Sequence, residues 1–375
     1  MRAGWQDKPL GDVCTLQRGF DLPTQDRKIG QFPLVSSSGI SDTHDKGPVL
    51  GPGVVTGRSG SIGNVFYIED SFWPLNTTLY VRDFHGNNPR FVYYLLVAFD
   101  LKKYAGGTGV PTLNRNDVHG VPVVVPRSLP EQQRIVTLLD EAFDGIATAK
   151  ANAEKNLQNA RAIFESHLQS VFDEAAEIGE SAVLADLATD ITDGDHMPPP
   201  KALQGVPFIT IGNIAKDTRT INFSDTFKVS RDYFDGLKAN KKPQLGDVLY
   251  TVTGSFGVPV LVSEKRDFCF QRHIGLVRPK PGVSSEWLYY LLMSPQVFKQ
   301  ANKGATGTAQ KTVSLKVLRG YRVPRVSLAI QLTTVAKLDA LFEETQRLQS
   351  LYQRKLTALD ELKKSLLAQA FSGAL

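Results

Sequence analysis

Two glycine-rich turns carry residue types that could hold an anion. The first contains Arg58, Ser59, Gly60 and Ser61, and the second contains Thr253, Gly254 and Ser255. Glycine lacks a Cβ atom, so the backbone of such a turn can approach a phosphate closely and offer it several N–H groups. The flanking hydroxyl and guanidinium groups would add further hydrogen bonds. The alternative interpretation is an ordinary tight turn that binds no ligand.

Two polar loops, each after an apolar helix, form a second kind of candidate. Their polar residues are Lys102, Lys103 and Thr108 in the first half of the chain, and Lys303, Thr306, Gln310 and Lys311 in the second. Lysines among small polar residues suit a polyanionic ligand, because ammonium groups neutralise phosphate charge. A solvated surface loop is the alternative.

One short segment holds residue types that recognise nucleobases. Gln271 and Arg272 belong to the amide and guanidinium classes that pair bidentately with adenine and guanine. Their neighbours Phe268 and Phe270 are expected to face a core instead. Together with His273, Gln271 and Arg272 form a third candidate cluster.

Asp193, Asp195 and His196 form the cluster that most resembles a metal site. Carboxylate and imidazole groups are good ligands, but two carboxylates and one histidine in a glycine-containing turn commonly bind no metal. We expect a loop ordered by its own aspartate side chains and no bound metal.

Composition excludes several classes of protein. The 375 residues are 42% hydrophobic and 22% charged, close to ordinary globular usage. No apolar run is long enough to cross a bilayer, and the first residues lack the apolar core of a signal peptide. Only Cys14 and Cys269 are present, without the spacing of a disulfide framework or a zinc site, which is typical of the cytoplasm. The net charge of +5 admits a polyanionic partner but does not demand one.

The usual signatures of an enzyme on DNA are missing from the sequence. There is no Gly-Lys-Ser/Thr motif for nucleotide hydrolysis. An amino-methyltransferase needs an Asn/Asp-Pro-Pro-Tyr/Phe loop, and the single Pro-Pro run, Met197–Lys201, lacks the flanking residues. We expect no catalysis and no cofactor.

The second half of the chain repeats the first. Five segments recur in order: Leu10–Val13 as Leu184–Leu187, Gly60–Gly63 as Gly254–Gly257, Phe91–Leu96 as Trp287–Leu292, Thr108–Gly109 as Thr306–Gly307, and Leu139–Phe143 as Leu338–Phe342. The offset grows from 174 to 199, so the second copy has extra residues before its glycine turn. Each copy is predicted to hold a strand-rich region, with strands at Val54–Thr56 and Asp247–Tyr250, followed by a long helix.

In the long helices, the positions spaced alternately four and three apart are mostly apolar, which is typical of a coiled coil. In the first helix these are Leu139, Phe143, Ile146, Lys150, Ala153, Leu157, Ala160, Phe164, His167 and Val171. In the second they are Leu338, Phe342, Thr345, Gln349, Tyr352, Leu356, Leu359, Lys363, Leu366 and Ala370. The net charges of 126–178 and 324–375 are −4 and +2, so we predict that the helices pair antiparallel. Separate packing of each helix on its own domain is the alternative.

The chain resembles the DNA-specificity subunit of type I restriction–modification systems over nearly its whole length. The resemblance rests on the repeat, the two glycine turns, the Ile191–His196 segment and the helix start Leu129–Ile135. The second helix start, Leu328–Gln331, departs from the family pattern because it lacks the proline and the glutamate.

The resemblance implies an α+β fold: target recognition domains at 1–127 and 179–325, separated by two long antiparallel helices at 128–178 and 326–375. It implies a cytoplasmic, non-catalytic subunit that recognises a split double-stranded DNA sequence and docks two adenine methyltransferase subunits and, through them, restriction subunits. A coiled-coil scaffold joining two protein-binding domains is the alternative. With the residues above, Arg115, His196 and Lys201 complete the set expected near DNA.

Overall fold

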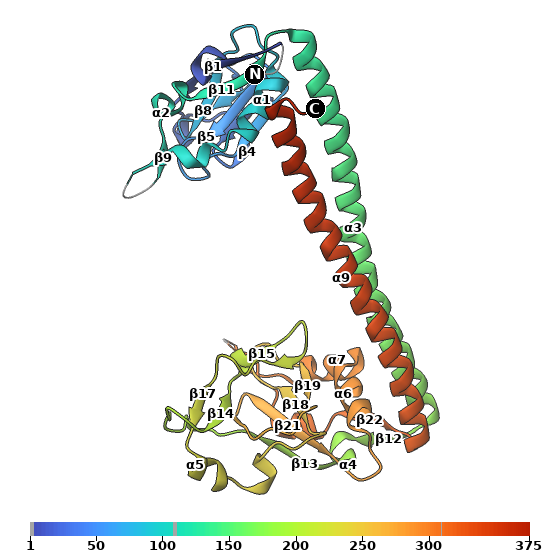
Figure 1. Cartoon of the computed structure of the whole chain (residues 1–375). Helices are drawn as coiled ribbons and strands as arrows, with labels where there is room; N and C mark the ends of the chain where they lie inside the picture. The colour runs from blue at the N-terminus through green and yellow to red at the C-terminus, as the bar shows by residue number, and fades with distance from the viewer. Residues whose placement is uncertain (1–3, 108–110, 309) are drawn as a thin grey trace. The chain divides into compact units, whose positions relative to one another are not determined.

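The computed structural model describes residues 4–107, 111–308 and 310–375 (Figure 1). It divides into two compact units, Met1–Glu154 with Gln353–Leu375 and Lys155–Tyr352. Each unit combines a region of strands and short helices with parts of the long helices α3 (Leu129–Ile178) and α9 (Leu328–Ser372). We call the strand-rich regions domain 1 and domain 2. The predicted α+β architecture with an internal repeat is confirmed.

Domain 1 contains two sheets and a closing strand pair. The larger sheet has the order β2-β8-β5-β6, with bounds Thr15–Arg18, Thr78–Asp83, Gly53–Gly57 and Val65–Ile68. The smaller has the order β4-β3-β7, with bounds Gly39–His44, Phe32–Ser36 and Trp73–Pro74. The first and last strands, β1 (Trp5–Pro9) and β11 (Pro122–Pro126), pair antiparallel just before α3. The other elements are η1 (Leu10–Asp12), η2 (Thr24–Asp26), α1 (Pro89–Ala98), η3 (Leu101–Tyr104), β9 (Ala105–Gly106), β10 (Thr112–Leu113) and α2 (Arg115–His119).

Domain 2 repeats this plan. Its larger sheet has the order β13-β21-β18-β19, with bounds Ala188–Asp193, Ile274–Pro279, Val248–Thr251 and Pro259–Leu261. Its smaller sheet has the order β17-β14-β20, with bounds Phe227–Val229, Val206–Ile209 and Cys269–Phe270. Its closing pair is β12 (Glu180–Val183) with β22 (Arg322–Arg325). The other elements are α4 (Leu184–Leu187), η4 (Ile211–Asn213), β15 (Ile214–Ala215), β16 (Thr220–Ile221), α5 (Arg231–Asp235), η5 (Ala239–Lys241), α6 (Ser285–Met293), α7 (Pro295–Gly304) and α8 (Leu315–Arg319).

The extra residues of the second copy lie where the offset between the repeats predicts them. The segment between β14 and β18 (210–247) holds η4, β15, β16, β17, α5 and η5, whereas the segment between β3 and β5 (37–52) holds β4 alone. The strands predicted before the two glycine turns are confirmed as β5 and β18. The insertion therefore leaves the order of strands in both sheets unchanged.

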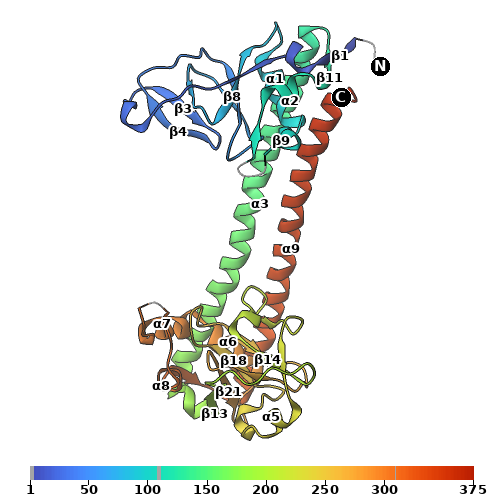
Figure 2. The same ribbon diagram turned by 90° about the vertical axis from the view of Figure 1, so that its left-hand side faces the viewer.

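Within each unit the two long helices run antiparallel, as predicted (Figure 1, Figure 2). In the first unit Lys150 forms a 2.7 Å ion pair with Asp360. In the second unit the rings of Phe164 and Phe342 lie 5.3 Å apart, and Arg161 donates to Gln349. In both units, residues later in α3 contact residues earlier in α9, as expected for antiparallel helices. The alternative of packing on the adjacent domain is realised as well, because the same helices also enter the domain cores.

The predicted seam of α3 holds only as far as Phe164. Leu139, Ala153 and Phe164 are buried on it, but His167, which the repeat pattern places in the seam, is exposed. Leu168 and Phe172 are buried instead. The four-residue spacing from Ala160 to Phe164 is therefore followed by another four-residue spacing, from Phe164 to Leu168, where the pattern requires three. A step of this kind moves the buried stripe around the helix. The reason lies in domain 2: the ring of Phe172 packs 5.8 Å from Trp287 of α6, so here the helix must cover a domain core as well as α9.

Each domain core includes side chains of both long helices. In the first unit, α3 contributes Ile135 and Leu139, and α9 contributes Leu367. In the second, α3 contributes Phe172 and α9 contributes Leu338. Because burial of such side chains is the main favourable term in folding, neither domain is complete without the helix pair.

A buried glutamine joins each domain to the long helix that follows it. Gln132 is 2% exposed; its Oε1 accepts from the backbone N–H of Asn88 at 2.9 Å, and its Nε2 donates to Asn87 Oδ1 at 2.7 Å. Gln331, also 2% exposed, accepts from the backbone N–H of Ser284 at 2.8 Å. Each glutamine therefore binds the backbone at the start of the helix α1 or α6.

A carboxylate eight residues further along each long helix makes a second connection. Asp140 accepts from Tyr94 and from Arg90, at 2.9 Å for the guanidinium. Asp339 accepts from Tyr290 at 2.6 Å. Burial and the carboxylate together raise the pKa of both tyrosines, so both phenols stay protonated donors. Two contacts about 12 Å apart along a helix fix the direction in which the domain is held on it.

Within the described ranges, every helix is either too short or too polar for a bilayer crossing.

We expect Gln132→Ala to lower the free energy of unfolding by about 1–3 kcal/mol, because it removes a buried amide and leaves the part-buried backbone N–H of Asn88 without its acceptor. Gln331→Ala should have an effect of similar size in the second unit. Urea unfolding of the full chain measures both effects. The matched control is Gln158→Ala, at an exposed position of α3, which should change stability by less than about 0.5 kcal/mol. Equal effects at all three positions would contradict a role for the buried amides.

Candidate nucleic-acid interface

Domain 2 contains a cavity of about 590 Å³ at its glycine turn. Its walls include five residues predicted near DNA: Thr253, Gly254, Ser255, Gln271 and Gln310. They come from three separate segments of the chain, which the fold brings to one place. Lys216 and His273 complete the polar lining.

The glycine turn is tied to the following loop by backbone contacts. Gly254 N–H donates to the carbonyl of Lys311 at 2.9 Å, and Thr253 pairs with Thr312 as an isolated bridge. Gly254 has a φ of +70°, which favours glycine there. Among the described residues the backbone N–H of Ser255 has no hydrogen-bond acceptor. The turn therefore presents a free N–H beside the hydroxyl of the same residue.

Lys216 is a site residue that the sequence did not reveal. Its Nζ donates to Ser255 Oγ at 2.6 Å, so an ammonium group lies at the turn. Lys216 belongs to the extra segment of the second copy, where the repeat gives no counterpart to compare. An isolated lysine in a segment without a counterpart in the first copy carries no sequence signal of its own.

The third candidate cluster follows the strand β20. Phe268 and Phe270 are each 1% exposed, which confirms that they face a core. Gln271 is anchored by its backbone N–H to Ile209 O at 3.0 Å, while Arg272 is exposed. Burial, and then the charge of Arg272, lower the pKa of His273, so its ring is neutral at pH 7.

The Asp193–His196 turn is held by a contact between its own side chains and by two residues from outside it. His196 contacts Asp193 at 2.9 Å, and Tyr233 donates to the Asp195 carboxylate. Lys241 donates to the carbonyl of Gly194 at 3.1 Å. In the described parts of the chain, no group of three or more His, Cys, Asp or Glu side chains is arranged to hold a metal. The turn leaves His196 exposed.

The ammonium group of Lys201 lies 5.4 Å from the ring centroid of Phe227.

In domain 1 the glycine turn and the next loop also meet. Arg58 and Ser59 donate their backbone N–H groups to Thr77 O at 2.8 and 3.2 Å, and Leu113 N–H donates to Arg58 O at 2.8 Å. Lys102 packs against Gly63, where an added Cβ atom would lie 2.7 Å from Lys102 Cγ. Gly60 has a φ of +81°.

The remaining predicted residues of domain 1 are less closely grouped. Lys103 forms a 3.2 Å ion pair with Asp100, and Arg115 is exposed at the first position of α2. Thr108 lies outside the described residues.

One expectation about the polar loops was wrong. The segment before Thr306 is helical as far as Gly304, as part of α7, and Lys102 and Lys103 lie in the short helix η3. In α7 the side chain of Ser294 accepts from Val297 N–H, which caps a helix that Pro295 begins. Lys303 is therefore held at the exposed end of a helix, and only the residues from Ala305 onward form a loop.

A family model described as the type I restriction modification DNA specificity domain matches residues 2–158 and 190–353. The chain belongs to this family. Each matched segment contains most of one strand-rich domain and the first part of the long helix that follows it; the second match begins within β13, after β12 and α4. The family's domain therefore corresponds to one copy of the repeat.

Relatives of the chain include specificity subunits of type I restriction enzymes. The EcoBI specificity subunit of Escherichia coli is 26% identical over 149 residues, which are 40% of this chain and 31% of that protein. The MjaVIII specificity subunit of Methanocaldococcus jannaschii is 23% identical over 263 residues, which are 64% of this chain and 60% of that protein. The chain thus spans less than two thirds of the length of each of these curated relatives.

Two solved structures share the fold over almost their whole length. One is a chain from a structure describing complex assembly and conformational transition of the type I R-M system. It is 18% identical, with a TM-score of 0.80, and the match covers 100% of this chain and 99% of that chain. The other is the HsdS subunit from Thermoanaerobacter tengcongensis, 20% identical, with coverages of 100% and 98% and a TM-score of 0.64. At these identities the likeness establishes the fold.

We expect Gly57→Ala to distort the glycine turn of domain 1, because a Cβ atom there would lie 2.0 Å from the carbonyl oxygen of Ser61. The backbone must shift to relieve the overlap, at a cost of about 1–3 kcal/mol. Gly106→Ala is the matched control, since an added Cβ atom meets nothing within 4 Å. Thermal unfolding of both variants tests this, and equal melting temperatures would contradict it.

Proposed function

We propose that the chain is a non-catalytic subunit that gives a type I restriction–modification complex its DNA specificity. The observation that carries the proposal is the repeated two-sheet domain, in a chain of the specificity family, with a glycine turn tied to polar loops in each copy. The recognition domains extend over 1–127 and 179–325, and each reads one half of a split double-stranded sequence. The long helices, at 128–178 and 326–375, join the two readers.

In this proposal the glycine turns bind the DNA backbone. The unengaged N–H of Ser255, its hydroxyl group and the adjacent Lys216 ammonium suit a phosphate oxygen. Lys303 and Lys311 are exposed on the same domain and add positive charge. Contacts of this kind fix the register of a protein on DNA but carry no sequence information.

Base readout is assigned to the exposed side chains beside the turns. Gln271 lines the cavity of domain 2, and Arg272 next to it is exposed and forms no ion pair with a described residue. Amide and guanidinium groups form bidentate pairs with adenine and guanine in the major groove. The buried strand β20 and its parallel partner β14 give this segment a rigid base.

Catalysis is assigned to partner subunits. The chain lacks the Asn/Asp-Pro-Pro-Tyr/Phe loop of amino-methyltransferases, so it needs no cofactor of its own. Its partners are two adenine methyltransferase subunits and, through them, restriction subunits. The names of its relatives, subunits of type I restriction enzymes, support this assignment.

Binding of the purified full chain to random duplexes at increasing salt tests the function. We expect the selected duplexes to share a split sequence, and the logarithm of affinity to fall linearly with that of salt, by about 0.9 per phosphate contact. Changing Lys303 and Lys311 together to Gln should reduce this slope by up to about 2 without changing the selected bases. Changing the exposed Lys337 and Lys355 of α9 is the charge-matched control. A chain that binds no DNA at any salt concentration supports the scaffold alternative and overturns the proposal.

Exchange of one domain tests whether the two readers are independent. Replacing residues 1–125 by the equivalent region of another family member should change one half of the methylated sequence and leave the other half intact. The physical reason is that each domain has its own sheets and core. Mapping of methylated adenines in cells that carry the hybrid chain reports the result. A change in both halves would contradict separate readers.

A further inference from the structure

Backbone hydrogen bonds match the two domains residue by residue. In domain 1, β7 runs parallel to β3, and Leu75 N–H then donates to Val35 O at 2.8 Å. In domain 2, β20 runs parallel to β14, and Gln271 N–H donates to Ile209 O at 3.0 Å. Three residues later each segment enters the larger sheet, at Thr78 in domain 1 and at Ile274 in domain 2. The turn is the same in both: Thr78 N–H donates to Leu75 O, and Ile274 N–H donates to Gln271 O. Leu75 is therefore the counterpart of Gln271.

The next residues follow directly from this register. Asn76 takes the place of Arg272, and Thr77 takes the place of His273. Their amino-acid types differ completely, so the repeat in the sequence gives no hint of the match. The segment Leu75–Thr77 is consequently absent from the residues that the sequence predicts near DNA.

A second set of contacts extends the match to the end of β2. Phe20 N–H donates to Pro74 O at 2.8 Å, as Asp195 N–H donates to Phe270 O at 2.9 Å. Phe20 follows Gly19, and Asp195 follows Gly194. A Cβ atom added to either glycine would lie within 2.3 Å of a carbonyl oxygen of the segment it crosses, so the backbones approach closely in both domains. The next residues, Asp21 and His196, are therefore counterparts. In domain 1, Asp21 contacts Asn76.

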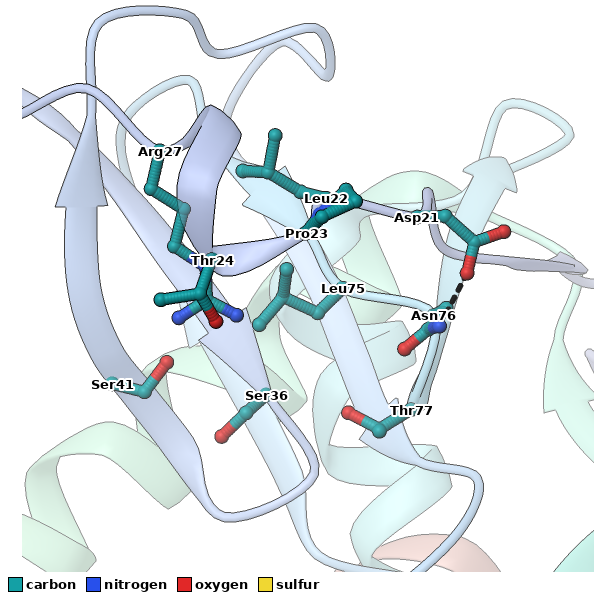
Figure 3. Close-up of a pocket in the computed structure, with 10 residues that line it drawn as sticks. All are labelled: Asp21, Leu22, Pro23, Thr24, Arg27, Ser36, Ser41, Leu75, Asn76 and Thr77. Atoms are coloured by element: carbon teal, nitrogen blue, oxygen red, sulfur yellow. Dashed lines mark hydrogen bonds between the residues drawn. The ribbon is translucent and has the colours of Figure 1, made fainter.

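These counterparts line a cavity of about 460 Å³ in domain 1 (Figure 3). Asn76 and Thr77 form one wall, and Ser36 and Arg27 lie across from them. The carbonyl oxygen of Thr77 accepts the N–H groups of Arg58 and Ser59, so this wall is continuous with the glycine turn. The Nε of Arg27 is buried and has no hydrogen-bond partner among the described residues. The cavity thus lies beside the glycine turn and contains a guanidinium nitrogen that lacks a partner among the described residues.

The contact with Asp21 fixes the orientation of the Asn76 amide. A carboxylate only accepts hydrogen bonds, so the amide nitrogen faces Asp21 and the amide oxygen faces away from it (Figure 3). The nitrogen keeps a second hydrogen free. Arg18 lies 3.3 Å from the same carboxylate and offsets its negative charge. Asn76 therefore offers one acceptor and one donor side by side.

We propose that Asn76 is a specificity-determining residue of domain 1, and that it reads the major-groove edge of an adenine. Its oxygen accepts from the adenine N6 amino group, and its nitrogen donates to N7. Asp21 acts as a positioning residue, which holds the amide in the orientation that this pairing needs. The inference rests on the proposed function of the chain as a DNA reader. Because Arg272 occupies the same place in domain 2, the two domains read different bases from one backbone framework.

The test compares three variants of the full chain by selection from random duplexes and by measured affinity. Asn76→Ala should weaken binding to the wild-type target by about 5- to 150-fold and make one adenine position in one half-site degenerate. Asn76→Arg should change the preference at that same position from adenine to guanine. Arg272→Ala is the matched control and should affect only the other half-site. Thermal unfolding of each variant should match the wild type, which separates loss of readout from loss of fold.

The outcomes separate this inference from the proposed function. A wild-type chain that selects no split sequence overturns the proposed function, and the inference with it. A wild-type chain that selects a split sequence, with both half-sites unchanged in Asn76→Ala and Asn76→Arg, overturns the inference alone. Loss of preference in the same half-site for Asn76→Ala and Arg272→Ala also overturns it, because it contradicts the match between the domains.

Discussion

The apolar stripe of a long helix must be covered, and this constraint determines the arrangement within both units. α3 has 50 residues and α9 has 45, each with an apolar seam too narrow to form a core alone. Pairing buries part of each seam, and the ends are covered by the domains: Leu139 and Leu367 enter the core of the first unit, and Phe172 and Leu338 that of the second. The helices are therefore structural parts of the domains and not only connections between them.

Polar contacts give this packing a direction that apolar burial alone does not provide. The hydrophobic effect is non-directional, so a domain held only by apolar contacts could rotate on its helix. Gln132 and Gln331 bind the first turns of α1 and α6, and Asp140 and Asp339 bind a tyrosine of the same helices. The same two contacts occur in both copies of the repeat. A buried amide tolerates little displacement, because a lost hydrogen bond there is not replaced by water.

The repeated framework separates the parts that hold position from the parts that differ. The order of strands, the close crossing after β2 or β13, and the register of β7 and β20 are the same in both domains. The side chains presented by that framework differ: Asn76 corresponds to Arg272, and Asp21 to His196. A fold of this kind can change what it recognises by replacing exposed residues, because the backbone geometry depends on strand pairing and on glycines.

The sequence by itself determined the repeat, the two long helices, the strands before the glycine turns and the place of the inserted segment. These features follow from local patterns, namely hydrophobic periodicity, glycine positions and recurrence at a nearly constant offset. It also indicated five residues that line the cavity of domain 2, from the recurring glycine turn, the polar loop near Thr306 and the residue types that recognise nucleobases. The tertiary structure decided the rest. The shift of the seam at Leu168 arises because α3 meets the core of domain 2, and the place of Asn76 arises because β7 pairs with a strand about forty residues earlier in the chain. Contacts between distant segments depend on which surfaces pack together, and no local pattern in the chain records that choice.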